Sequence, residues 1–216
     1  MKRAFGLDIP TSLGEWCVPQ RLALIVYDMQ AGIVPQIDGS AAIVAGCERV
    51  VAAARAGGFR IFYTRHIYLP NRIAGVGQLR RAMVWQKQDD PEQTKPWFGY
   101  GSPAWQIVPQ LTPRNDEAVI DKITMSAFEG TYLDIALRDA GLQAFLIMGI
   151  ALEVGIEPTV RHGLDLNYVP VMVPELCGSK TTEAHERSLT TLRETGEVYF
   201  ESEATMIELL RGSSTR

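Results

Sequence analysis

The stretch Phe145–Pro158, with the sequence FLIMGIALEVGIEP, decides the predicted fold of this chain. Phe145 to Met148 are four consecutive apolar residues, as expected of a strand that is buried on both faces. The small residues 149–151 predict a tight turn, and the residues from Leu152 onward predict a helix whose first turn carries Glu153. A strand, turn and helix in this order place backbone N–H groups at the carboxyl edge of a parallel sheet, where such sheets bind their ligands.

Apolar runs of the same kind alternate with helical patterns along the whole chain. The predicted strands are residues 22–27, 60–64, 117–121, 145–148, 169–173 and 197–200. The predicted helices are residues 41–56, 132–139, 152–167, 182–195 and 204–211, and the tail 212–216 is expected to fray. Crossover connections of this length predict a doubly wound, mainly parallel six-stranded sheet between two helical layers, an α/β/α arrangement in one domain over residues 1–216.

The composition excludes several classes of function. The chain has 216 residues, of which 46% are hydrophobic, and a net charge of −4 without a basic cluster, so we expect neither nucleic acid nor an anionic membrane as partner. Its longest apolar run, residues 144–152, is far shorter than the roughly 20 residues of a membrane span. The N-terminus does not resemble a signal peptide, and the three cysteines are odd in number and widely spaced. We therefore expect a cytoplasmic protein without disulfides, metal or other cofactor.

Three polar residues follow predicted strands and are candidates for the functional edge of the sheet. Asp28 follows strand 22–27, and its alternative role is to cap the next helix. Lys122 follows strand 117–121, where an ammonium group can share a proton with a carboxylate; the alternative is a solvated surface lysine. His66 follows strand 60–64 and is expected to pack or hydrogen-bond there, because no second metal ligand is close in sequence.

Residues 67–116 interrupt the alternation of strands and helices. This segment is rich in proline and holds Trp85, Trp97 and Trp105. An aromatic excursion of this length is typical of a functional segment, and we expect it to serve both as the wall or lid of a pocket and as a subunit contact in a homo-oligomer, a dimer or tetramer. Residues 1–20 lack periodicity and are expected to form a surface arm.

Five short motifs resemble those of the isochorismatase-like hydrolases, also called the cysteine hydrolase superfamily, in the same order and spacing. They are YDMQ at 27–30, YTRH at 63–66, DKxxxSAF at 121–128 followed by GT, GIAxEV at 149–154, and ELCGS at 175–179. The resemblance implies that Asp28 and Lys122 are catalytic. It also implies a cis peptide bond between Ile150 and Ala151, which turns backbone amides inward as an oxyanion hole.

The chain departs from the family at the nucleophile. Most members have a cysteine where this sequence has Gly155, and glycine offers no nucleophilic atom. Cys177 is expected after the next strand, in the wrong place to substitute, and Glu175 stands where the family often has aspartate. The isochorismatases likewise have glycine there, which is expected to clear room for a bulkier substrate.

That branch implies an acid mechanism, in which Asp28 protonates a vinyl ether carbon, water captures the cation and pyruvate is released. Asp28 then needs a raised pKa from an apolar pocket. The candidate pocket residues for a small carboxylated substrate are His66, Trp85, Trp97, Phe128 and Glu153. Two alternatives stay open: an amidohydrolase scaffold that is inactive or only binds small molecules, and an engineered glycine at position 155.

Overall fold

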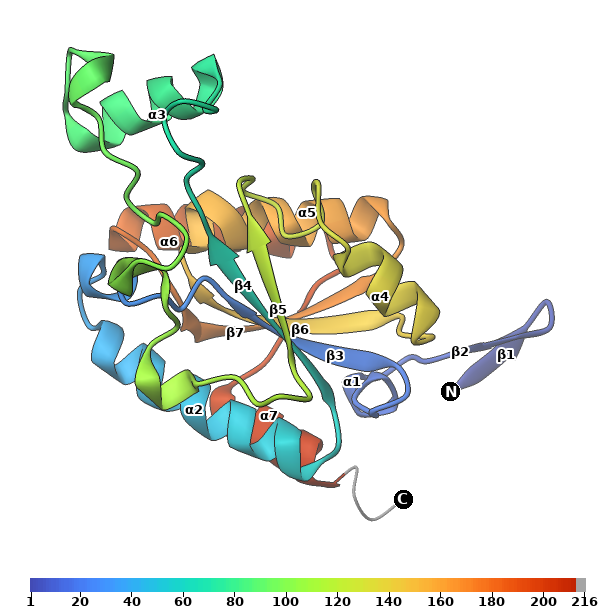
Figure 1. Ribbon diagram of the computed structural model, residues 1–216. Coiled ribbons are helices and arrows are strands. Elements are labelled where there is room, and N and C mark those ends of the chain that lie inside the picture. The colour runs from blue at the N-terminus through green and yellow to red at the C-terminus, as the bar shows by residue number, and fades with distance from the viewer. Residues whose placement is uncertain (213–216) are drawn as a thin grey trace.

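The computed structural model describes residues 1–212, and the expectation for the tail beyond them lies outside the described residues (Figure 1). At its centre is a six-stranded sheet in the order β5-β4-β3-β6-β7-β8, in which every neighbouring pair is parallel. The strands are β3 (Leu22–Tyr27), β4 (Arg60–His66), β5 (Ala118–Lys122), β6 (Ala144–Ile150), β7 (Val169–Gly178) and β8 (Tyr199–Phe200). The predicted six-stranded α/β sheet is confirmed.

Helices cover both faces of this sheet and complete the predicted three layers. On one face lie α2 (Ser40–Ala56) and α7 (Glu203–Gly212). On the other face lie α4 (Leu133–Asp139), α5 (Glu157–Asp165) and α6 (Thr182–Glu194), as Figure 1 shows. Short 3₁₀ turns lie at Val34–Gln36, Pro91–Gln93, Pro103–Trp105 and Pro109–Leu111, and a single π-helical turn, Leu152–Ile156, leads into α5. None of the helices in residues 1–212 is long and apolar enough to cross a membrane.

Strand β3 is the central strand of the core, and all six of its residues are buried. Its side chains alternate between the two faces, since successive residues of a strand point to opposite sides. Leu22, Leu24 and Val26 pack on the side of α2 and α7. Ala23, Ile25 and Tyr27 pack on the side of α4, α5 and α6. Burial on both faces explains why the strand has an uninterrupted apolar sequence.

The order of the strands reverses beside β3. From β3 the chain moves outward to β4 and β5, then returns to place β6 on the other side of β3. In doubly wound sheets, ligands bind outside the carboxyl ends of the strands at this switch point. The residues that follow β3 and β6, Asp28 and Ala151, therefore lie at the place where a site is expected.

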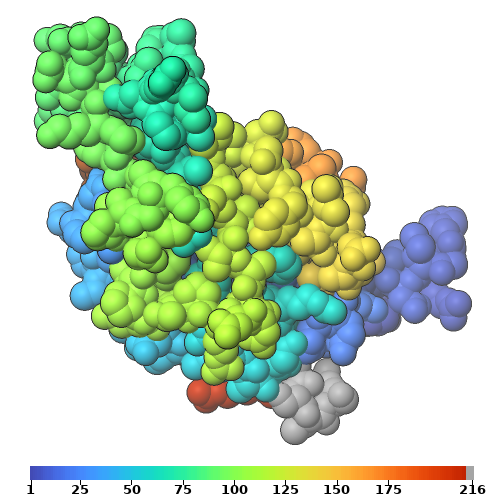
Figure 2. All heavy atoms as spheres, in the orientation of Figure 1, coloured from blue at the N-terminus to red at the C-terminus, as the bar shows by residue number. Residues whose placement is uncertain are grey.

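Two segments contain elements that the sequence pattern did not predict. Residues 1–20 form a hairpin of β1 (Lys2–Ala4) and β2 (Leu7–Ile9) and a short helix α1 (Leu13–Trp16), and the hairpin stands away from the body of the molecule (Figure 2). The segment 67–116 includes helix α3 (Val76–Gln86), which also projects from the main body (Figures 1 and 2). Ala82 is the single buried residue of α3, so this helix lacks the apolar stripe from which a helix is predicted in a sequence.

Strand β7 is longer than predicted. It continues past Val173 to Gly178, through Pro174 and Glu175, with a shift of register in its pairing with β6. Proline is tolerated in a strand at such an irregularity. As a result Cys177 lies inside the strand and not after it.

Candidate functional site

The carboxylate of Asp28 is held at the end of β3 by a residue of the neighbouring strand β4. Asp28 has a φ of +46°, in the left-handed region that residues other than glycine seldom adopt. Its backbone N–H donates to Thr64 Oγ1 at 3.1 Å, and the Thr64 hydroxyl donates back to Asp28 Oδ1 at 2.5 Å. Thr64 thus fixes both the backbone and the carboxylate of Asp28, which is buried. The carboxylate faces the end of the sheet instead of capping the next helix.

Lys122, at the end of β5, pairs with the other oxygen of this carboxylate. Its Nζ lies 2.7 Å from Asp28 Oδ2, 2.8 Å from the hydroxyl of Tyr27 and 3.2 Å from the carbonyl oxygen of Thr124. An ammonium group has three N–H donors, so each of them has an acceptor. The Lys122 side chain is fully buried, and the alternative of a solvated surface lysine is wrong.

Burial acts on the two charges of this pair in opposite directions. It raises the pKa of Asp28 above its ordinary value, and it lowers the pKa of Lys122, because both charged forms lose their hydration. The attraction between the partners counteracts both shifts without cancelling them. Two groups this close titrate as a unit that can hold one proton on either partner. The pair is therefore suited to proton transfer.

The turn after β6 forms another wall of the site. The peptide bond between Ile150 and Ala151 is cis, at the position that the family resemblance implies. The N–H groups of Gly155 and Ile156 donate to the carbonyl oxygen of Ala151 at 3.0 and 3.1 Å. These two amides are already hydrogen-bonded within the turn, so an oxyanion hole formed at this turn has to use other N–H groups.

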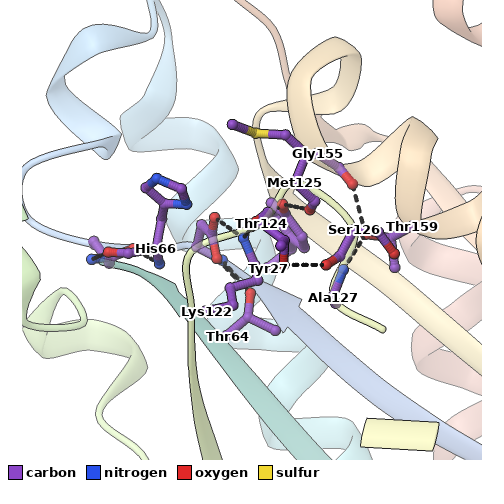
Figure 3. A network of polar contacts seen from close by, with 12 residues as sticks. Tyr27, Thr64, His66, Lys122, Thr124, Met125, Ser126, Ala127, Gly155 and Thr159 are labelled. Carbon is purple, nitrogen blue, oxygen red and sulfur yellow. Dashed lines mark hydrogen bonds and ion pairs between the residues drawn. The ribbon is translucent and has the colours of Figure 1, made fainter. Parts of the chain in front are cut away.

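Gly155 lies directly against Tyr27. A Cβ atom at position 155 would overlap the Tyr27 hydroxyl and would lie 2.6 Å from Cε1 of its ring, closer than real Cβ contacts come. The Tyr27 hydroxyl donates to the carbonyl oxygen of Met125 and accepts from Lys122 (Figure 3). Position 155 therefore cannot carry a side chain while Tyr27 stays in place. Gly155 lines the cavity, but the space that a Cβ would take there is filled by Tyr27 and is not open to substrate.

Asp28 opens onto a cavity of about 360 Å³, within the usual range for sites that bind small molecules. The cavity extends from the sheet edge to the segment 67–116, which supplies much of its aromatic wall. The two exposed lysines Lys87 and Lys180 add positive charge to it. Its lining includes Tyr27, Asp28, Ile33, Gln36, Ile37, His66, Val84, Trp85, Trp97, Phe98, Met125, Ile150, Ala151, Glu153, Val154 and Gly155.

Four of the five predicted pocket residues line this cavity. Trp85 belongs to α3, and Trp97 to the loop after it. Glu153 accepts a hydrogen bond from the backbone N–H of Lys180 through Oε1 at 3.0 Å, while Oε2 is buried without a hydrogen-bond partner among the described residues. The cavity thus carries one acidic side chain besides Asp28.

His66 is the fourth predicted pocket residue that lines the cavity, and its side chain is neutral. Its ring packs edge-on against Tyr68 and Phe98, with centroids 5.5 and 6.1 Å apart. Burial, together with the positive charges of Lys122 and Arg81, lowers the pKa of His66 to about 3. The histidine therefore contributes an uncharged, aromatic surface to the cavity at neutral pH.

Phe128 does not line the cavity, so its prediction as a pocket residue is wrong. Its ring packs in the core with Phe145 and Tyr168, at centroid distances of 5.7 and 5.5 Å. The neighbouring Ala127 N–H donates to Thr159 Oγ1 of α5 at 3.0 Å. This bond draws the segment against α5, and the phenyl ring enters the core beneath that helix.

No cysteine side chain reaches the site. Cys17, Cys47 and Cys177 are all buried, and Cys177 Sγ lies 3.9 Å from the carbonyl oxygen of Ile147 inside the sheet. Burial raises the pKa of all three thiols. Residues 1–212 contain no group of three or more His, Cys, Asp or Glu side chains that could hold a metal ion.

Sequence reasoning missed Thr64 and Tyr27 as members of this site. Thr64 is the polar residue of an otherwise apolar part of β4, which is a usable signal. Tyr27 is the last residue of the predicted buried strand 22–27, and nothing local distinguishes its hydroxyl from that of a core tyrosine. The approach of Tyr27 to Gly155 depends on the pairing of β3 with β6, in which Tyr27 lies opposite Gly149.

The chain is similar in sequence to proteins of a known family. A family model described as the isochorismatase domain matches residues 22–204. The uncharacterized isochorismatase family protein YwoC of Bacillus subtilis is 30% identical over 174 residues, which cover 79% of this chain and 84% of that protein. The ureidoacrylate amidohydrolase RutB of Serratia proteamaculans is 28% identical over 174 residues, which cover 73% of this chain and 69% of that protein.

Solved structures share the fold. A cysteine hydrolase from Pseudomonas syringae pv. phaseolicola superposes with a TM-score of 0.78 at 23% identity, over 90% of this chain and 94% of that chain. N-carbamoylsarcosine amidase from Thermoplasma acidophilum superposes with a TM-score of 0.67 at 18% identity, over 85% of this chain and 96% of that chain.

Proposed function

The chain belongs to the isochorismatase family of hydrolases, and on that premise we propose that it hydrolyses a small carboxylated substrate by proton transfer from Asp28, without a covalent enzyme intermediate. One observation carries the proposal. The buried pair of Asp28 and Lys122 faces a cavity in which position 155 has neither a side chain nor space for one. Water is then the attacking group, and the protein supplies protons and electrostatics.

A vinyl ether that carries a carboxylate fits this chemistry. Asp28 donates its proton to the terminal vinyl carbon, which leaves an oxocarbenium ion beside the new carboxylate. Water adds to the cationic carbon and loses a proton, and the resulting hemiketal breaks its C–O bond to release an alcohol and pyruvate. Burial favours this role because it raises the pKa of Asp28 and so favours the protonated acid at the start of the reaction.

Lys122 has a complementary role in this cycle. Once Asp28 has given up its proton, the ammonium at 2.7 Å stabilises the carboxylate that remains. The proton that water releases can then return to the pair.

The walls of the cavity favour a flat, partly apolar substrate. Trp85 and Trp97 offer aromatic faces, and neutral His66 adds another. The ammonium groups of Lys87 and Lys180 can meet a substrate carboxylate. A homo-oligomer, dimer or tetramer, and a cytoplasmic location remain part of this proposal.

A second candidate is a C–N hydrolase scaffold that is inactive or only binds small molecules. What favours it is the similarity to RutB, a ureidoacrylate amidohydrolase by name. The overlap of a Cβ at position 155 with Tyr27 argues against cysteine chemistry of any kind at this position.

A substrate panel separates the two candidates. The purified protein is incubated with isochorismate, with ureidoacrylate and with an N-carbamoyl amino acid, and pyruvate and ammonia are measured by coupled enzyme assays. Our proposal predicts pyruvate from isochorismate and no ammonia from the other two compounds. Binding by calorimetry without either product would favour the inactive scaffold, and ammonia without pyruvate would contradict both candidates.

A further inference from the structure

We infer that Tyr27 is a positioning residue of this site: its hydroxyl fixes the Lys122 ammonium against Asp28, and its ring takes the space that a side chain at position 155 would need. The inference deepens the proposed function, since it concerns the same proton-transferring pair. It adds a third member to the two residues at the strand ends. Tyr27 is the first residue of the YDMQ motif, but the family resemblance assigns a role only to Asp28 in that motif.

The hydrogen bonds of the Tyr27 hydroxyl with Met125 and Lys122 have defined directions. The hydroxyl donates its proton to the Met125 carbonyl, so a lone pair of its oxygen is left to accept from Lys122 at 2.8 Å. Burial raises the pKa of Tyr27 well above its ordinary value, so the hydroxyl stays protonated and keeps this orientation at neutral pH. Tyr27 therefore acts on Lys122 as a fixed acceptor and not as a competing charge.

The ring of Tyr27 supports the same ammonium. Lys122 Nζ lies 4.3 Å from the centroid of this ring, within the range of a cation–π contact. With Asp28 Oδ2 and the Thr124 carbonyl, the hydroxyl completes the three acceptors of a fully buried ammonium. Removal of one acceptor leaves an N–H group of that ammonium without a partner, which disfavours its charged form.

The position of the Tyr27 ring also explains why residue 155 is a glycine. The Tyr27 side chain is part of the core on the side of α4, α5 and α6, so neighbouring residues hold it in place. Any side chain at position 155 must displace it. A tyrosine at 27 and a nucleophile at 155 thus exclude each other, and a Gly155→Cys substitution alone cannot build a thiol site.

The first test is a double-mutant cycle on thermal stability. Gly155→Ala is expected to lower the unfolding midpoint by several degrees, and Gly77→Ala, whose Cβ meets no atom within 4 Å, serves as its control. In a Tyr27→Val background the drop caused by Gly155→Ala should shrink, because the ring is gone. In a Tyr27→Phe background it should persist, because the ring carbons remain. A Gly155→Ala protein as stable as the wild type, or an equal drop in all three backgrounds, would overturn the steric part of the inference.

The second test measures Lys122 directly. Lysine labelled with ¹⁵N at Nζ is incorporated, and the titration of Lys122 is followed by NMR in the wild type, in Tyr27→Phe and in Tyr68→Phe. The control is matched, since Tyr68 is a buried tyrosine whose hydroxyl has no hydrogen-bond partner among the described residues. Tyr27→Phe should lower the pKa of Lys122 and Tyr68→Phe should leave it unchanged. If Lys122 titrates alike in all three proteins, Tyr27 does not position it.

Neither measurement needs a substrate. A protein that releases no pyruvate would therefore refute the proposed function and leave the role of Tyr27 to be decided by these two tests.

Discussion

The hydroxyl of Tyr27 lies so close to Gly155 that it would overlap the Cβ of any side chain at that position. Tyr27 is the last residue of β3, and Gly155 lies in the π-helical turn that follows the adjacent strand β6. Their contact makes the glycine a requirement of the local packing and leaves Asp28 and Lys122 as the ionisable pair at the end of β3. The account of catalysis without a thiol depends on this relationship.

A cysteine-alkylating reagent should neither modify the native protein nor change its rate of turnover. Cys17, Cys47 and Cys177 are buried, and burial raises the pKa of Cys17 and Cys47 to about 12, so little thiolate is present at neutral pH. Treatment with iodoacetamide at pH 7.5 followed by intact mass measurement should show unmodified protein, whereas the same treatment in urea should modify all three residues. Rapid loss of activity, together with the mass of one added alkyl group on the native protein, would contradict this expectation.

Removal of one charge of the buried pair should destabilise the protein more than removal of both. Lys122→Met leaves the Asp28 carboxyl without its counter-ion, which should cost about 3 kcal/mol of unfolding free energy. The double variant Asp28→Asn/Lys122→Met should cost less than Lys122→Met alone, and therefore less than the sum of the two single changes. Urea denaturation measures all four proteins, and Lys95→Met, at an exposed position, serves as control and should change stability by less than about 0.5 kcal/mol. Additive costs would mean that the two groups do not interact.

Stability should fall on acidification because of His66. Its folded pKa of about 3 lies below the value of 6.5 for an exposed histidine, so the unfolded chain binds the proton more readily. The neutral buried form thus stabilises the fold fully above pH 6.5, and this contribution is lost as pH falls toward 3, by up to about 1.4 kcal/mol per pH unit. Urea unfolding between pH 7 and 4 should show a shallower pH dependence for His66→Leu than for the wild type. Parallel curves would show that His66 does not titrate this way.

Trp85 should contribute to substrate binding more than to folding. It lines the cavity, yet 39% of its surface is exposed in the free protein. Trp85→Ala should raise KM about tenfold, equivalent to about 1.4 kcal/mol of binding, with kcat little changed. Val76→Ala, on the same helix α3 but outside the cavity lining, is the matched control. Equal KM values for both variants would mean that α3 is not a wall of the working site.

The sequence predicts the central sheet well because the burial of each strand is visible in its own residues. Strands β3 and β6 are buried on both faces, and each therefore has a continuous apolar sequence that stops at a polar or small residue. Asp28 and Lys122 follow from the same reasoning, since strand ends at one edge of a parallel sheet bring their next residues together.

Other features depend on contacts that no single stretch of sequence reveals. Helix α3 and the N-terminal hairpin bury few side chains, so neither produces a periodic apolar pattern. Phe128 could equally have faced a cavity or the core, and the hydrogen bond from Ala127 to Thr159 decides for the core. The overlap between Tyr27 and position 155 requires knowledge of strand neighbours and of the path of the turn after β6.

The most direct test of the central claim is the rate of pyruvate release from isochorismate by Asp28→Asn, compared with the wild type and with Asp139→Asn, a carboxylate on the surface of α4. The account predicts that the wild type and Asp139→Asn release pyruvate at the same rate, and that Asp28→Asn is slower by at least about a hundredfold, the contribution expected of a general acid. Unchanged pyruvate release by a folded Asp28→Asn protein would contradict it.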